Sequence, residues 1–276
     1  MDGSNSSEAL DRFAAFYDLE YADYNEDVSF YLNYASIYRD EPDPQASIQS
    51  RKPQILELGC GTGRLLVPLA RAGCEVVGVD ASPAMLAIAS DRLAAAGVSD
   101  CIPLTAEMSK ANLPAGYRAD LIIIALNTFQ YLTSMEAQIA TLRRLRPHLA
   151  EDGRLIIALP GPTIWPDQER LDNILYLQGS FAAPSGGTVQ KWFTATYDPI
   201  SQLQAVTFIY DEIQSDGTLR RTLAPLTLRY TFRYEMEHLL AACGYHLERL
   251  YGSYELDPLT ADSAHMIFVA QGGHEP

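Results

Sequence analysis

From residue 53 onward, short runs of valine, isoleucine and leucine alternate along the chain with amphipathic stretches. This alternation is typical of a parallel sheet that helices cover on both faces. Helices are expected at residues 82–97, where Ser82 can cap the first turn, and at residues 135–149. Strands are expected at residues 54–58, 75–79, 102–105, 120–126 and 154–159.

Residues 187–232 interrupt this rhythm. They contain three long segments rich in threonine and aromatic residues, separated by Asp-Pro and Ser-Asp-Gly turns, at residues 188–197, 203–213 and 219–232. Such segments predict an antiparallel sheet inserted into the α/β pattern. The alternation then resumes, with one helix and two strands expected at residues 234–243, 247–251 and 266–270.

The 276 residues therefore suit one α/β core with additions rather than two large domains. Residues 1–50 are expected to form a helical N-terminal lid. The core is expected to comprise residues 51–160 and 234–276. Residues 161–233 would form the antiparallel insertion, which could serve as a substrate-binding lid or a dimerisation region.

A glycine-rich run marks the end of the first expected strand. Gly59, Gly61 and Gly63 occupy alternate positions there, directly before a helical pattern that begins near Leu65. Because glycine has no Cβ, the backbone can adopt positive φ angles and a ligand can lie directly against it. A glycine loop between a strand and a helix is where nucleotide cofactors commonly bind.

Three cofactor classes compete for this loop: a dinucleotide, a nucleoside triphosphate and S-adenosylmethionine. The triphosphate motif requires Gly-Lys-Ser/Thr and the dinucleotide motif Gly-x-x-Gly, and neither stands here. Asp80 ends the second expected strand, close to the roughly 20-residue spacing of a ribose-binding carboxylate. Glu57 would repel a pyrophosphate but suits the ammonium and sulfonium groups of S-adenosylmethionine. The charges favour the sulfonium cofactor.

The run from Glu57 to Gly63, followed by Asp80, closely resembles motif I and the second-strand acid of class I S-adenosylmethionine-dependent methyltransferases. The resemblance spans residues 50–160 and 234–271. It implies an α/β fold with a Rossmann-like, doubly wound sheet of seven strands, the last antiparallel, and here also an inserted antiparallel β lid. The implied cofactor is S-adenosyl-L-methionine.

The same resemblance implies roles for particular residues. Glu107 replaces the commoner aspartate that binds the adenine amino group. Arg64 is equally compatible with two roles, a solvated helix residue and a ligand of the cofactor carboxylate. The methionine part of the cofactor would lie at the end of the fourth strand. The residues expected to bind the cofactor are Glu57, Gly59, Cys60, Gly61, Gly63, Asp80, Ala81, Met85, Ala106, Glu107, Met108, Leu126 and Asn127.

The residues after the fourth strand bear on the methyl acceptor. Leu126-Asn127-Thr128-Phe129 differs from the Asn/Asp-Pro-Pro-Tyr/Phe motif of enzymes that methylate bases and amides, and no acidic cluster follows for a metal. The runs at 16–21, 127–132 and 251–254 resemble the branch that includes glycine N-methyltransferase and nucleotide-sugar N,N-dimethyltransferases. An amine nitrogen of a small molecule is the expected acceptor, with a hydroxyl as the alternative. An NAD-dependent oxidoreductase and a noncatalytic cofactor-binding protein are alternatives from other classes.

Tyrosines crowd the first forty residues, and two of them, Tyr17 and Tyr21, are candidates for positioning the acceptor. Tyr131 is a third candidate, at a position where the sugar enzymes often carry a histidine. A tyrosine-lined lid could exclude water while its hydroxyl groups orient a nucleophile. The expected catalytic residues are thus Tyr17, Tyr21 and Tyr131.

Composition restricts the classes of partner that the protein is expected to bind. A net charge of −15 disfavours nucleic acid, so a small molecule is the expected substrate. The four cysteines lack metal-ligand spacing and suggest reduced thiols in the cytoplasm, and no metal site is expected. The polar N-terminus and the absence of a long apolar run argue against secretion and membrane association. The inserted sheet could pair two subunits as a homodimer.

Overall fold

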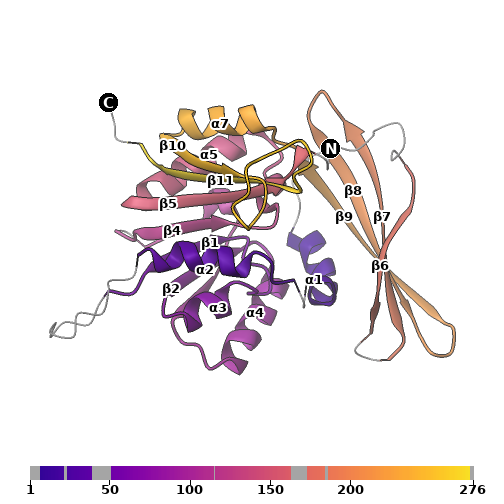
Figure 1. The fold of residues 1–276 in the computed structure, drawn as a ribbon. Helices are drawn as coiled ribbons and strands as arrows, with labels where there is room; N and C mark the ends of the chain where they lie inside the picture. The colour runs from indigo at the N-terminus through magenta and orange to yellow at the C-terminus, as the bar shows by residue number, and fades with distance from the viewer. Residues whose placement is uncertain are drawn as a thin grey trace.

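The computed structural model describes residues 7–21, 24–38, 51–114, 116–162, 173–183 and 186–273. A mixed sheet covered by helices and a separate antiparallel sheet stand side by side, with the N-terminal helix α1 (Ser7–Tyr21) between them (Figure 1). None of the described helices is long and apolar enough to cross a membrane.

The larger sheet has seven strands in the order β10-β11-β5-β4-β1-β2-β3. The last strand, β11, runs antiparallel to both of its neighbours, while β1 to β5 are parallel. This arrangement confirms the Rossmann-like class. The strand bounds are β1 Gln54–Leu58, β2 Glu75–Asp80, β3 Cys101–Thr105, β4 Ala119–Ile124, β5 Leu149–Pro160, β10 Tyr245–Tyr251 and β11 His265–Gly272.

Helices cover both faces of this sheet because its strands are apolar on both sides. Along β4, Ile123 packs on the face that holds α2 (Val28–Ser36), α3 (Leu66–Arg71) and α4 (Pro83–Ala95). Ile122 packs on the opposite face, beneath α5 (Met135–Leu145) and α7 (Arg233–Ala242). Short 3₁₀ helices among the described residues of the core are η1 Met108–Lys110, η2 Thr128–Tyr131 and η3 Arg146–His148.

The smaller sheet is a four-stranded antiparallel meander in the order β6-β7-β8-β9. One face of it packs on α1, where Phe16 stacks on Tyr210 with ring centroids 4.3 Å apart. The other face points away from α1 (Figure 1). The strands are β6 Tyr176–Ala182, β7 Thr188–Asp198, β8 Leu203–Ile213 and β9 Leu219–Arg229.

Several predicted boundaries were wrong. The fourth strand ends at Ile124 rather than at residue 126, because Leu126 and Asn127 adopt positive φ angles of 44° and 64° that no strand allows. The helix expected at residues 135–149 ends at Leu145, since Pro147 fits only the short turn η3 and Leu149 already begins β5.

The strand β6 was not expected, because its seven residues are mostly exposed and include a glycine. The N-terminal region contains two helices, α1 and α2, within its described part. Residues 39–50 and 163–172, which belong to the expected lid and insertion, lie outside the described residues.

Candidate functional site

The glycine loop connects β1 to α3 at the point where the strand order reverses between β1 and β4, which is where open α/β sheets bind ligands. Gly59, Gly61 and Gly63 have φ angles of +70°, +54° and +79°. A Cβ on Gly59 would lie 2.1 Å from Cγ2 of Thr128 in η2. Gly59 also donates to the carbonyl of Val79 at 2.7 Å. The loop is therefore held against the ends of both neighbouring strands.

Asp80, at the end of β2, anchors the loop. Its carboxylate accepts hydrogen bonds from the backbone of Gly61 at 2.8 Å and of Ser82 at 2.9 Å. Burial raises the pKa of Asp80, while these backbone donors oppose that rise. Since each carboxylate oxygen accepts more than one hydrogen bond, Asp80 retains acceptor capacity for a ribose hydroxyl.

Glu57 is a buried carboxylate beside the loop. It is only 3% exposed, and its Oε2 has no hydrogen-bond partner within the described structure. Burial raises the pKa of Glu57 to about 8, and although Arg64 opposes this rise, Asp27 and Asp80 add to it. An unpaired buried carboxylate is unfavourable unless a cation reaches it. This orphaned oxygen fits the ammonium group of S-adenosylmethionine.

Arg64, whose role the sequence left open, is engaged by the protein itself. Its guanidinium donates to both oxygens of the fully buried Asp27 at 2.5 and 2.7 Å, and lies 5.2 Å from the ring centroid of Tyr24. The pair fixes α2 to the start of α3. The Arg64 side chain is thus paired within the protein and only 12% exposed, so it is not a solvated surface residue, and its role toward the cofactor carboxylate stays a prediction.

The residues expected near the adenine lie on two elements. Glu107 follows β3, and Ala106 beside it donates to the carbonyl of Asp80 at 2.9 Å. The Glu107 side chain is 59% exposed and pairs with Lys110 at 2.8 Å. Met85 of α4, in contrast, is buried against α1. Their adenine-binding roles, with those of Ala81, Cys60 and Met108, stay predictions.

The chain after β4 turns sharply toward the glycine loop. Leu126 and Asn127 both occupy the left-handed region, and Asn127 donates to the carbonyl of Ala158 on β5 at 3.2 Å. Consecutive non-glycine residues in this region store strain, which concentrates at ligand sites. This backbone stands where the resemblance expects the methionine part of the cofactor.

The three candidate tyrosines gather over the loop. The rings of Tyr17 and Tyr21 stack with centroids 4.5 Å apart, and a Cβ on Gly61 would lie 3.8 Å from the Tyr17 ring. Burial raises the pKa of Tyr17, Tyr21 and Tyr131, and the Tyr21 side chain adds to the rise at the other two. All three hydroxyl groups are therefore neutral at pH 7.

A buried polar triad that the sequence did not reveal adjoins these tyrosines. Glu20 of α1 accepts hydrogen bonds from Lys191 of β7 and, at 2.5 Å, from the hydroxyl of Tyr210 on β8. The Tyr210 pKa is raised by burial and Glu20, with smaller effects from Tyr21 and Tyr131. Only the register of β7 against β8 brings this lysine and tyrosine opposite each other.

Further contacts hold α1 on the core. Asp18 accepts hydrogen bonds from Thr62 in the glycine loop at 2.6 Å and from Arg92 of α4 at 2.8 Å. Asp11 accepts hydrogen bonds from Ser82 and, at 3.2 Å, from the backbone of Ala84 at the start of α4. The helix α1 therefore joins the glycine loop to the smaller sheet.

Known proteins match both the core and the whole chain. A family model described as "Methyltransferase domain" matches residues 56–155. YqeM of Bacillus subtilis is 26% identical over 80% of this chain and 84% of its own length. A ubiquinone biosynthesis O-methyltransferase of Methylobacterium nodulans is 30% identical over 36% of this chain, which spans only 39% of that relative.

Solved methyltransferase structures share the complete fold. CcbJ from Streptomyces caelestis superposes with a TM-score of 0.76 at 23% identity, covering 99% of this chain and 100% of its own. The sugar N-methyltransferase KedS8 from Streptoalloteichus sp. gives a TM-score of 0.68 at 20% identity, covering 94% and 93%. These likenesses include the second sheet.

A methyltransferase domain therefore spans residues 56–155, and the fold of the whole chain is one that solved S-adenosylmethionine-dependent methyltransferases share. One solved neighbour, the amino pentose methyltransferase CalS10 of Micromonospora echinaspora, contains bound S-adenosylmethionine; it superposes with a TM-score of 0.63 at 21% identity, covering 89% of each chain. The oxidoreductase that the glycine loop alone left open is not supported by any of these matches.

Proposed function

We propose that the protein transfers the methyl group of S-adenosylmethionine to an amine nitrogen of a small molecule. The observation that carries this proposal is the cluster of neutral hydroxyl groups of three partly buried tyrosines, Tyr17, Tyr21 and Tyr131, beside the glycine loop. Such groups can orient an acceptor by hydrogen bonds, but they are poor bases at neutral pH.

Amine and hydroxyl acceptors differ in how they lose their proton before they attack the methyl group. When bound, the cofactor supplies a methyl group on a sulfonium, which a nucleophile displaces directly. A neutral amine already carries the required lone pair, since it can lose its proton to water beforehand, whereas a hydroxyl acceptor is activated by a nearby base. Glu20, the carboxylate that reaches the tyrosines, already accepts from Lys191 and Tyr210. An amine therefore suits this site better.

The cofactor roles follow the same logic. We assign Glu57 to the ammonium group, Asp80 to the ribose and the strained backbone of Leu126 and Asn127 to the methionine part. The unpaired Oε2 of Glu57, the remaining acceptor capacity of Asp80 and the positive φ angles support these assignments. Tyr17, which covers Gly61, would close the site against water.

Labelled turnover tests the acceptor atom. The purified protein is incubated with S-adenosylmethionine carrying a deuterated methyl group and a panel of amino sugars, amino acids and simple phenols. We expect mass spectrometry and NMR to locate the label on nitrogen. Transfer to oxygen alone would instead favour the hydroxyl alternative, to which the name of the Methylobacterium relative also points.

We further propose a homodimer formed by the outer face of the smaller sheet, the face that points away from α1. Four apolar residues form a row across its strands there: Leu177, Trp192, Ile209 and Leu223. The charged pair nearest the row, Asp211 and Arg221, is joined by two hydrogen bonds of 2.6 and 2.7 Å. An apolar face whose nearest charges pair with each other suits a second copy of a chain whose net charge of −15 otherwise repels it.

A further inference from the structure

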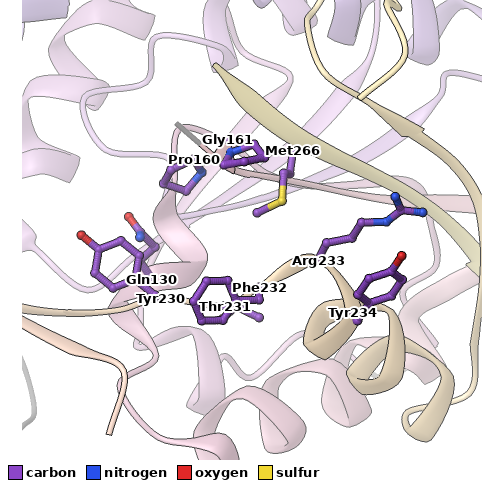
Figure 2. A pocket seen from close by; sticks show the side chains of 10 residues that line it. Gln130, Pro160, Gly161, Tyr230, Thr231, Phe232, Arg233, Tyr234 and Met266 are labelled. Atoms are coloured by element: carbon purple, nitrogen blue, oxygen red, sulfur yellow. The ribbon is translucent and has the colours of Figure 1, made fainter. Parts of the chain in front are cut away.

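A pocket separate from the tyrosine cluster opens at the carboxyl ends of β4 and β5 (Figure 2). Its volume is about 270 Å³. Pro160 ends β5, and Met266 lies near the start of β11. The segment from Tyr230 to Tyr234 links β9 to α7 and includes the first two residues of that helix. Most of these side chains present apolar surface. Gln130, from η2, closes one side of the pocket.

The geometry of η2 separates this pocket from the methyl-transfer site. In a 3₁₀ helix of three residues per turn, side chains three apart share a side and those between them point elsewhere. Thr128 contacts the glycine loop and Tyr131 faces Tyr21, so these two share one side. Phe129 is fully buried in the core, and Gln130 turns to the pocket. The helix therefore forms a wall between two sites.

Gln130 is the polar group that the fold leaves unused there. It is only 6% exposed, and its side-chain amide has no hydrogen-bond partner among the described residues. The neighbouring polar group, the hydroxyl of Thr231, already accepts a hydrogen bond from Gln138 at 2.9 Å. The Gln130 amide is thus accessible from the pocket with its donor and acceptor both unused, and a ligand that pairs with them gains those hydrogen bonds.

The charges around the pocket argue against a charged ligand. Arg233, at the pocket edge, donates to Glu237 at 2.8 Å and lies over the Tyr234 ring, 5.0 Å from its centroid. Its charge is thus already balanced. No carboxylate lines the described wall of the pocket to receive a cation. A primary amide offers one donor and one acceptor, which matches an uncharged group with the same pair.

We propose that this pocket is a second binding site, for an uncharged apolar ring or chain that carries an amide or carbonyl group hydrogen-bonded to Gln130. This second site goes beyond the proposed methyl transfer, since it assigns ligand recognition to the side of η2 that faces away from the tyrosines. The ligand can be a separate molecule or a distant part of the acceptor.

Binding of small probes tests the site on the full chain without cofactor. The probes are δ-valerolactam, an uncharged ring amide, and piperidine, a charged ring of the same size. In NMR titrations we expect the lactam to bind more tightly and to shift the signals of Gln130, Thr231 and Met266. Gln130→Met preserves the length of the side chain and should weaken lactam binding about tenfold, as expected for one lost hydrogen bond.

Gln178→Met, on the exposed strand β6, is the matched control and should leave the lactam affinity unchanged. Thermal denaturation of each variant verifies that it is folded. Equal affinity of the lactam for the Gln130→Met and unmodified proteins would overturn the proposal, as would shifts centred on Tyr17 and Tyr21. Absence of any lactam binding also refutes it. None of these outcomes depends on methyl transfer, so the proposed function is tested separately.

Discussion

At the scale of single residues, Glu57 links the interior of the protein to its cofactor. A carboxylate with a pKa near 8 is largely protonated at pH 7, and it becomes charged only when a cation compensates for its burial. In the cofactor site proposed above, the ammonium group provides that cation. Binding should therefore release a proton from Glu57, and the affinity should depend on pH.

We predict that S-adenosylhomocysteine binds more tightly as the pH rises from 6 to 8, by at most about tenfold per unit, because the free protein holds the proton that binding must displace. Above the Glu57 pKa of about 8 the affinity should level off. Calorimetry across this range measures the effect. Glu57→Gln should remove the dependence, and the exposed Glu151→Gln should not. A flat profile for the unmodified protein would contradict the assignment.

Asp80 holds the glycine loop and, in the proposed site, also binds the ribose. We predict that Asp80→Ala weakens S-adenosylhomocysteine binding by about 1–3 kcal/mol, because the ribose loses an acceptor and the backbone donors of Gly61 and Ser82 lose theirs. Calorimetry measures the loss. Asp100→Ala, which removes an exposed carboxylate paired with Lys52, is the control and should bind normally. Unchanged affinity in Asp80→Ala would place the ribose elsewhere.

At the scale of elements, the helix α1 connects the core to the smaller sheet. Its carboxylates bind the glycine loop and α4 on one side, and Glu20 binds Lys191 and Tyr210 on the other. Because Glu20 and Lys191 are both buried, each depends on the other for its charge. The position of Tyr17 and Tyr21 over the loop depends on this helix.

We predict that Lys191→Met lowers the free energy of unfolding by about 3–5 kcal/mol, since it leaves the Glu20 carboxylate buried without its cation. The double variant Glu20→Gln with Lys191→Met should recover most of the loss, because the uncompensated charge is gone. Urea denaturation of the unmodified protein, Lys191→Met, Glu20→Gln and the double variant completes the double-mutant cycle. If the single and double variants are equally unstable, the lysine contributes packing rather than charge compensation.

At the scale of the whole molecule, no other described element covers the outer face of the smaller sheet, β6 to β9 (Figure 1). Leu177 and Leu223, at the two ends of the apolar row, are 49% and 47% exposed. A two-fold axis through this row would bring identical residues together.

We predict that the protein, of 30.5 kDa per chain, elutes as a dimer, and that Leu223→Lys converts it to a monomer by placing two cations in the contact. Light scattering coupled to size-exclusion chromatography measures the mass. Ile200→Lys is the control, because Ile200 is 94% exposed in the turn between β7 and β8 and lies outside the row. A monomeric unmodified protein would refute the proposed interface.

The sequence by itself determined the α/β core and most of its strands along the chain, and it indicated S-adenosylmethionine as the cofactor. These follow from local signals: apolar runs on strands buried on both faces, glycines that need positive φ angles, and Asp80 at the end of the strand after them. Only the tertiary structure decided how distant residues pair, as Arg64 does with Asp27, Glu20 with Lys191 and Tyr210, and Gln130 with an open pocket. Such partners are separated by long stretches of chain, and strand register, helix placement and burial alone bring them together.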